Sequence, residues 1–293
     1  MDLILFSHLF NGLWMLALPI GLAIFLTRRF RMSWRLVWIG AATFILSQVG
    51  HIPFNSFALN PLLQALTPVL PPGLVLLASA ILLGLSAGLF EEGSRYLVLR
   101  YWAKGARSWG SGLLFGAGHG GMEAIILGVF VLATFVNLVA IRGTDLATIV
   151  PPAQLATAQQ QVAAYWGVPW YDALLGALER TLTIPCQIAM AVLVMQAFTR
   201  GKLRWLWLAV LYHALLDAVA VYLMGVLGQQ SGAAYIIEGG VAVFTLLSLA
   251  LILLLRQPEP PAPAGPPPPP PPVPLRAIEP PVTPENLETS RFQ

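Results

Sequence analysis

Residues 73–101 read GLVLLASAILLGLSAGLFEEGSRYLVLRY, a long apolar run with four charged residues toward its end. About 20 apolar residues are needed to cross the hydrocarbon core of a bilayer as a helix. A charged residue inside such a run costs roughly 2.5–3.5 kcal/mol on insertion scales and usually marks function. Arg95 lies one helical turn after Glu91 and Glu92, so it can neutralise one of them. The stretch therefore predicts a membrane helix that carries a functional site.

The whole chain has a similarly apolar composition. Of its 293 residues, 57% are hydrophobic and 10% are charged, whereas an ordinary soluble domain has about 45–50% and about 25%. This composition excludes a cytosolic globular enzyme, a disordered regulator and a nucleic-acid-binding domain, so no nucleic-acid partner is expected. The one cysteine, Cys186, excludes an intramolecular disulfide.

Apolar runs divide residues 1–256 into seven spans, which predicts an all-α polytopic membrane bundle of about seven transmembrane helices. The fourth span is longer than one crossing needs, which indicates tilt, a kink or an extension beyond the membrane. The outer loop at 143–171 is expected on or near the membrane surface. The predicted spans are 3–27, 35–57, 73–101, 109–141, 172–199, 204–227 and 234–255.

Basic residues in alternate loops predict the orientation. The remaining loops contain one basic residue, Arg142. Because cytoplasmic loops are enriched in lysine and arginine, we expect the N-terminus outside and the C-terminus in the cytoplasm of a prokaryotic plasma membrane. The basic residues of the predicted cytoplasmic side are Arg28, Arg29, Arg31, Arg35, Arg100, Lys104, Arg107, Arg200, Lys202, Arg204 and Arg256.

Residues 257–293 form a separate region by composition. Of the 25 prolines, 15 lie beyond Gln257, and Pro266 to Pro272 form an unbroken run. Such a segment has too little apolar surface to offset the entropy of ordering, so we expect a disordered, partly polyproline-II cytoplasmic tail. A spacer is the favoured role, and a proline-recognition partner is the alternative.

Two further spans carry polar pairs at helical spacing. His119 and Glu123 are four residues apart in a glycine-rich segment, and His213 and Asp217 repeat that spacing in the sixth span. At about 1.5 Å per residue, His119, His213 and Glu92 all lie roughly 12–15 Å below the predicted cytoplasmic face. A shared site explains this agreement better than chance.

This combination of side chains predicts hydrolysis within the membrane. A carboxylate with two imidazoles in an apolar environment can activate water and hold the resulting oxyanion. The same Glu92, His119 and His213 can instead bind a divalent metal such as zinc, and the sequence does not choose between the two. Gly-x-Ser-x-Gly and His-Glu-x-x-His motifs are absent, so serine and ordinary zincin chemistry have no support.

The three motifs, in this order, resemble those of the type II CAAX prenyl protease and bacteriocin-processing superfamily of intramembrane proteases. The glycine-rich segment from Gly118 to Ala124 is more similar to the YhfC-like branch, and PrsW proteases are relatives. The motifs that carry the resemblance are Glu91-Glu92-x-x-Arg95, Phe115-x-x-x-His119 and His213-x-x-x-Asp217.

The resemblance implies that Glu92 activates water and that His119 and His213 orient the substrate or stabilise the oxyanion. It also implies that Asp217 supports His213. Arg95 follows the acids one residue sooner than in the prenyl proteases, and Asp217 stands where asparagine is common. Prenylated substrates are therefore not implied.

Structural roles compete with catalysis at several positions. For Glu91 an ion pair with Arg95 is favoured, although it stays a catalytic candidate, and for Glu123 both roles remain open. Glu179 and Arg180 lie far from the other motifs by helical rise, which favours an interfacial ion pair, with gating of substrate entry as the alternative.

Three more polar residues of the spans are assigned structural roles. Gln187 follows Pro185 and is expected to satisfy a backbone group that the proline frees. His51 and Asn55 are expected to cap or pack.

Together the motifs predict an intramembrane endopeptidase that cleaves a membrane protein or peptide in the cytoplasmic half of the bilayer. A non-catalytic scaffold, or an ion- or proton-coupled transporter that uses the same polar core, is the alternative. Transporters usually contain an internal repeat with broken helices, whereas these three motifs differ from one another.

Overall fold

The computed structural model describes residues 2–228 and 230–258, and all but the first two residues of the predicted tail lie outside this part. Within it the chain is helical and contains no strand, which confirms the predicted all-α fold. The helices are α1 (Leu3–Phe30), α2 (Arg35–Phe54), the π-helix η1 (Asn55–Leu59), α3 (Asn60–Leu66), α4 (Pro72–Tyr101), α5 (Trp109–Ala140), the 3₁₀ turn η2 (Leu146–Thr148), α6 (Pro152–Gly167), the 3₁₀ turn η3 (Asp172–Leu174), α7 (Leu175–Thr199), α8 (Arg204–Leu227) and α9 (Ala233–Leu254).

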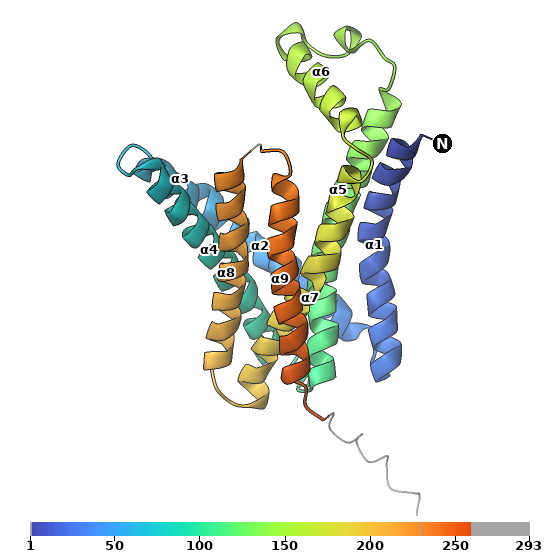
Figure 1. The fold of residues 1–293 in the computed structure, drawn as a ribbon. Helices are drawn as coiled ribbons and strands as arrows, with labels where there is room; N and C mark the ends of the chain where they lie inside the picture. Colours follow the sequence, from blue (N-terminus) through green and yellow to red (C-terminus); the bar gives the residue numbers. More distant parts are fainter. Residues whose placement is uncertain (1, 229, 259–293) are drawn as a thin grey trace, which may run out of the picture. The chain divides into compact units, whose positions relative to one another are not determined.

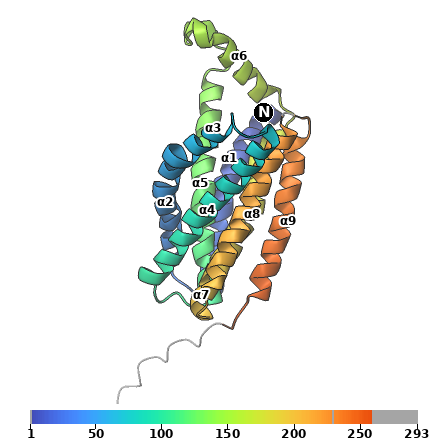
Figure 2. The ribbon, with the colours of Figure 1, turned by 90° about the vertical axis from the view of Figure 1, so that its left-hand side faces the viewer.

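Seven helical segments of the described residues are long and apolar enough to cross a membrane, as predicted. Figures 1 and 2 show them as one bundle, with the N-terminus at one end and the end of α9 at the other. The loops that follow α1, α4 and α7 lie at the end opposite the N-terminus (Figure 1). These are the arginine- and lysine-rich loops, so the chain is a multi-pass membrane protein whose basic loops share one end.

The second span is longer than predicted and ends at Leu66 instead of residue 57. Pro53 lies in the last turn of α2 and cannot donate a backbone hydrogen bond. The helix continues as η1, in which the Asn60 N–H donates to the Asn55 carbonyl five residues back. Such π-helical turns are often found at functional sites.

The outer loop contains a helix that the sequence pattern did not predict. Its sequence in α6 is rich in alanine and glutamine, which are good helix formers, and Pro152 occupies the favoured first position. None of its residues is buried. An exposed helix of this kind has no apolar periodicity strong enough to reveal it.

Helix α7 is the centre of the bundle. In its most apolar window 72% of the residues are buried, compared with 17–33% in the other six spans. It packs against α1, α4, α5, α8 and α9. Its buried polar residues, Arg180, Gln187 and Gln196, are therefore shielded by the neighbouring helices.

Small residues bring the motif-carrying helices close together. A Cβ atom on Gly118 of α5 would lie 2.0 Å from the Val37 carbonyl oxygen of α2, and one on Gly84 of α4 would lie 2.3 Å from the Ala214 carbonyl oxygen of α8. Only glycine permits such backbone approach between membrane helices. The two close pairs place α5 against α2 and α4 against α8, and α2 also packs against α4.

Candidate active site

Glu92 lies where α4 packs against α8. Its Oε1 atom is 2.8 Å from Nδ1 of His213, and both side chains are buried, with 0% and 2% of their residue surface exposed. An ionised carboxylate only accepts hydrogen bonds, so Nδ1 of His213 carries the proton. This leaves Nε2 of His213 directed away from Glu92.

The neighbouring Glu91 binds the other histidine. Its Oε2 atom is 3.1 Å from Nε2 of His119, and its Oε1 accepts a hydrogen bond of 3.2 Å from Gln48. The His119 ring is fully buried beside Phe44, and its Nδ1 atom has no hydrogen-bond partner among the described residues. The predicted arrangement of one carboxylate with two histidines is thus replaced by two separate carboxylate–imidazole pairs.

Arg95 connects these two pairs. Its Nη1 atom is 3.1 Å from Glu92, its Nη2 atom is 3.7 Å from Glu91, and none of its side chain is exposed. Arg95 therefore contacts both acids, whereas the sequence predicted one. We call Glu91, Glu92, Arg95, His119 and His213 the histidine cluster.

Gln187 on α7 holds Arg95 from the other side. Its backbone oxygen accepts a hydrogen bond of 3.1 Å from Nη1 of Arg95, and its side-chain oxygen accepts one from Nη2. The sequence predicted that Gln187 would bond to a backbone group freed by Pro185, so its contact with Arg95 was missed. An amide within a turn of a proline gives no signal of an arginine partner on another helix.

Glu123 belongs to a second group of charges. Its Oε1 atom is 2.7 Å from Nη1 of Arg180, which also pairs with Glu179, and its Oε2 accepts a hydrogen bond of 2.9 Å from Gln187. Glu123 thus faces α7 and not the histidine site. We call Glu123, Glu179 and Arg180 the Arg180 cluster, and Gln187 links it to Arg95.

The prediction that Glu179 and Arg180 are remote from the motifs is therefore wrong in one respect. Helical rise measures distance along α7 only, and it misses the side chains of Glu123 and Gln187 that bridge the gap.

Asp217 lies at the edge of the histidine cluster, and His51 packs beside Asn55 and Phe90. Oδ2 of Asp217 is 3.7 Å from Nε2 of His213, which is longer than a hydrogen bond, and 35% of the Asp217 side chain is exposed. Asp217 therefore faces His213 without a hydrogen bond, whereas Glu92 is hydrogen-bonded to the ring. His51 contacts Asn55 at 3.0 Å, and Asn55 accepts a hydrogen bond from Ser86 at 2.6 Å. These contacts agree with the packing role predicted for His51 and Asn55.

Seven membrane helices around buried pairs of glutamate and histidine define a polytopic membrane protein with a buried polar site. The chain matches the family model described as YhfC intramembrane metalloprotease over residues 14–237. It is 31% identical over 236 residues to a Bacillus subtilis (strain 168) protein described as "Uncharacterized membrane protein YhfC", which covers 78% of this chain and 88% of the relative. No solved structure matches. The chain belongs to the YhfC intramembrane metalloprotease family, and its relationship to PrsW proteases stays a prediction from the motifs.

The family description implies a metal ion. The side chains of the site are therefore compared with the ligands that a metal ion needs. No three histidine, cysteine, aspartate or glutamate side chains within the described part of the chain form a group that could hold a metal ion. The predicted ligands are divided, because His119 binds Glu91 while His213 binds Glu92. The Arg95 guanidinium occupies the cationic position beside both carboxylates, and a metal would have to displace it. The side chains as arranged do not fit a metal ion.

Proposed function

We propose that this protein is an intramembrane endopeptidase in which Glu92 and His213 activate the hydrolytic water. The observation that carries the proposal is their buried contact, 2.8 Å between Oε1 and Nδ1, in a membrane bundle of a protease family. A carboxylate that orients an imidazole recurs in acid–base catalysis on unrelated folds.

In the proposed reaction, the Glu92–His213 pair takes one proton from water while the oxygen of that water bonds to the carbonyl carbon of the substrate. The carbon–nitrogen bond then breaks, and the pair returns the proton to the departing nitrogen. The products are a carboxylic acid and an amine, and the pair ends in its starting state. Asp217 supports the charged form of His213 from 3.7 Å away.

His119 is proposed to orient the substrate. The Glu91 carboxylate only accepts hydrogen bonds, so Nε2 of His119 carries the ring proton. The Nδ1 atom, which is buried without a partner among the described residues, is then left as an acceptor for an N–H group of the substrate. Glu91 is then a positioning residue for His119.

The proposed substrate is a membrane protein or a peptide inserted in the bilayer. Glu92 and His213 are almost fully buried, while the side chains of Glu91 and Asp217 are 9% and 35% exposed. We therefore place the entry at Glu91 and Asp217, and these side chains have to shift before a peptide reaches Glu92.

The test is Glu92→Gln in the full chain reconstituted with a cleavable membrane peptide. The amide keeps the size of the side chain but removes the carboxylate from the Glu92–His213 pair, so turnover is expected to fall by at least about 100-fold. The matched control is Glu238→Gln on α9, which changes the same group outside both clusters. Undiminished turnover in Glu92→Gln, or an equal loss in the control, contradicts the assignment. A membrane protein that accumulates uncleaved in cells carrying Glu92→Gln would identify the natural substrate.

A further inference from the structure

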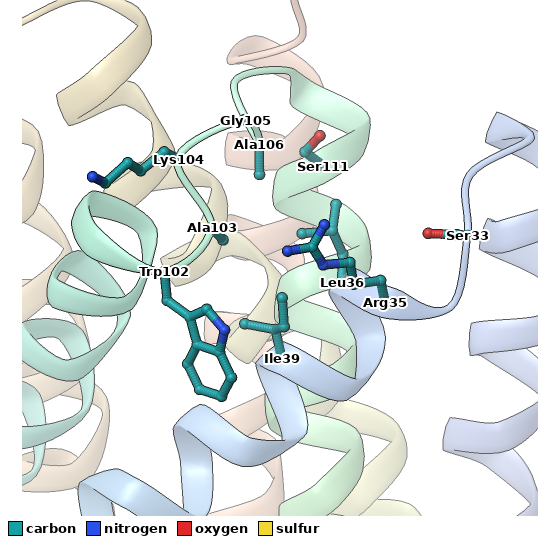
Figure 3. Close-up of a pocket in the computed structure, with 10 residues that line it drawn as sticks. All are labelled: Ser33, Arg35, Leu36, Ile39, Trp102, Ala103, Lys104, Gly105, Ala106 and Ser111. Atoms are coloured by element: carbon teal, nitrogen blue, oxygen red, sulfur yellow. The ribbon is translucent and has the colours of Figure 1, made fainter.

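A second polar site lies away from both charge clusters, between the start of α2 and the loop that joins α4 to α5. It is a pocket of about 210 Å³, and its lining includes Ser33, Arg35, Trp102 and Lys104. Figure 3 shows the Arg35 guanidinium reaching into the space between α2 and the loop, with the Trp102 ring nearby, while the Lys104 side chain extends from the loop away from Arg35.

The pocket has an excess of positive charge. Arg35 and Lys104 line it, and no acidic residue does. Within residues 2–228 and 230–258, neither of these two cations forms an ion pair. The two charges are therefore free to attract an anion.

The backbone adds to this preference. Helix α2 is 20 residues long and begins at Arg35, and its N-cap residue, Trp34, makes no side-chain capping hydrogen bond. The free N–H groups and the dipole of such a helix end favour a bound anion. Ser33, immediately before this end, supplies a further hydroxyl donor in the pocket.

The location favours a lipid over a soluble anion. Trp34, Trp38 and Trp102 are 39%, 63% and 52% exposed, as expected for tryptophans at a membrane–water interface. The predicted orientation places this end of the bundle at the cytoplasmic leaflet, which carries anionic lipids. Basic pockets between membrane helices on that side are suited to phosphate headgroups.

We propose that this pocket binds the phosphate of an anionic phospholipid. Arg35 provides the direct contact, Lys104 attracts the headgroup from the loop, and the acyl chains lie along the exposed apolar surfaces of α2 and α4. The site is separate from the histidine cluster and does not depend on the proposed protease activity.

The test is binding of phosphatidylglycerol to the full chain in detergent, followed by native mass spectrometry with phosphatidylcholine as the competing lipid. Each basic residue near a membrane surface contributes about 1 kcal/mol, so Arg35→Gln with Lys104→Gln is expected to weaken the tightest site roughly 10- to 30-fold. The single variant Lys104→Gln alters only an exposed loop side chain, and it is expected to weaken binding by about fivefold even if the double variant misfolds.

The matched control is Lys202→Gln with Arg204→Gln, which removes the same charge from another basic loop at the same end of the bundle. It is expected to change the affinity by less than about twofold. Equal losses of lipid affinity in both double variants would mean that the basic loops attract the lipid through their total charge. That result would overturn the proposal that the pocket binds it. Inorganic phosphate at millimolar concentration is expected not to displace the lipid, and full displacement would show that the site takes a free phosphate instead.

Discussion

The histidine cluster and the Arg180 cluster have the same charged core, one arginine with two glutamates, but only the first also contains imidazoles. The two arginines are equally sequestered, with Arg95 0% and Arg180 5% exposed. The carboxylates differ, because the Glu123 and Glu179 side chains are 22% and 44% exposed, while those of the histidine cluster are at most 9% exposed. Only the histidine cluster combines proton-carrying groups with a dry environment, which is what acid–base chemistry needs.

The largest expected difference between the clusters is in turnover. His213→Gln removes the imidazole from Glu92 and is expected to lower kcat by about 100- to 10,000-fold, the usual contribution of a positioned acid–base group. The control is His8→Gln on α1, a histidine that is also buried but lies outside both clusters. If a cleavage assay finds the same rate for His213→Gln and His8→Gln, the histidine cluster has no special role in catalysis.

The second difference is in stability. Arg95→Gln leaves Glu91 and Glu92 buried without a cation, which is expected to cost about 3–5 kcal/mol in the free energy of unfolding. Arg180→Gln is expected to cost less, since the side chains of its partners Glu123 and Glu179 are partly exposed. Denaturant titration in detergent measures both. A larger loss of stability for Arg180→Gln than for Arg95→Gln would contradict this expectation.

A smaller effect is expected at Gln187, the link between the clusters. Gln187→Leu removes the side-chain contacts with Arg95 and Glu123 and leaves the backbone contact, so we expect kcat to fall roughly tenfold with little change in KM. Gln196→Leu is the control, because Gln196 is also buried on α7 but makes its contacts near the helix end. A rise in KM alone would indicate a role in substrate binding.

The smallest effect is expected at Glu179. Its side chain is 44% exposed, and exposed ion pairs contribute about 0–1 kcal/mol. Glu179→Gln should therefore change kcat by less than about threefold and leave the free energy of unfolding within about 1 kcal/mol of the original. A loss as large as that expected for His213→Gln would mean that the Arg180 cluster takes part in catalysis.

The apolar spans could be predicted from the sequence because bilayer thickness sets their length. The shared level of Glu92, His119 and His213 also followed, since helical rise converts residue number into depth. Which carboxylate binds which histidine did not follow. That choice depends on the rotation of α4, α5 and α8 about their axes, and spans that are apolar on all sides carry no periodicity that records rotation.

The same reason explains the residues that were missed. The partners of Gln187 lie on α4 and α5, and no spacing along α7 encodes them. The second span was predicted past Pro53 as far as residue 57, and its continuation to Leu66 through the π-helical turn η1 was missed.

The most direct test of the central claim, that Glu92 and His213 act as one catalytic unit, is a double-mutant cycle on kcat. Glu92→Gln, His213→Gln and the double variant are compared in one reconstituted cleavage assay, with Glu92→Gln and Glu179→Gln as the control pair. Members of one unit lose activity non-additively, so the double variant is expected to be about as slow as the slower single variant. Losses that multiply, as expected for the control pair, would contradict the claim.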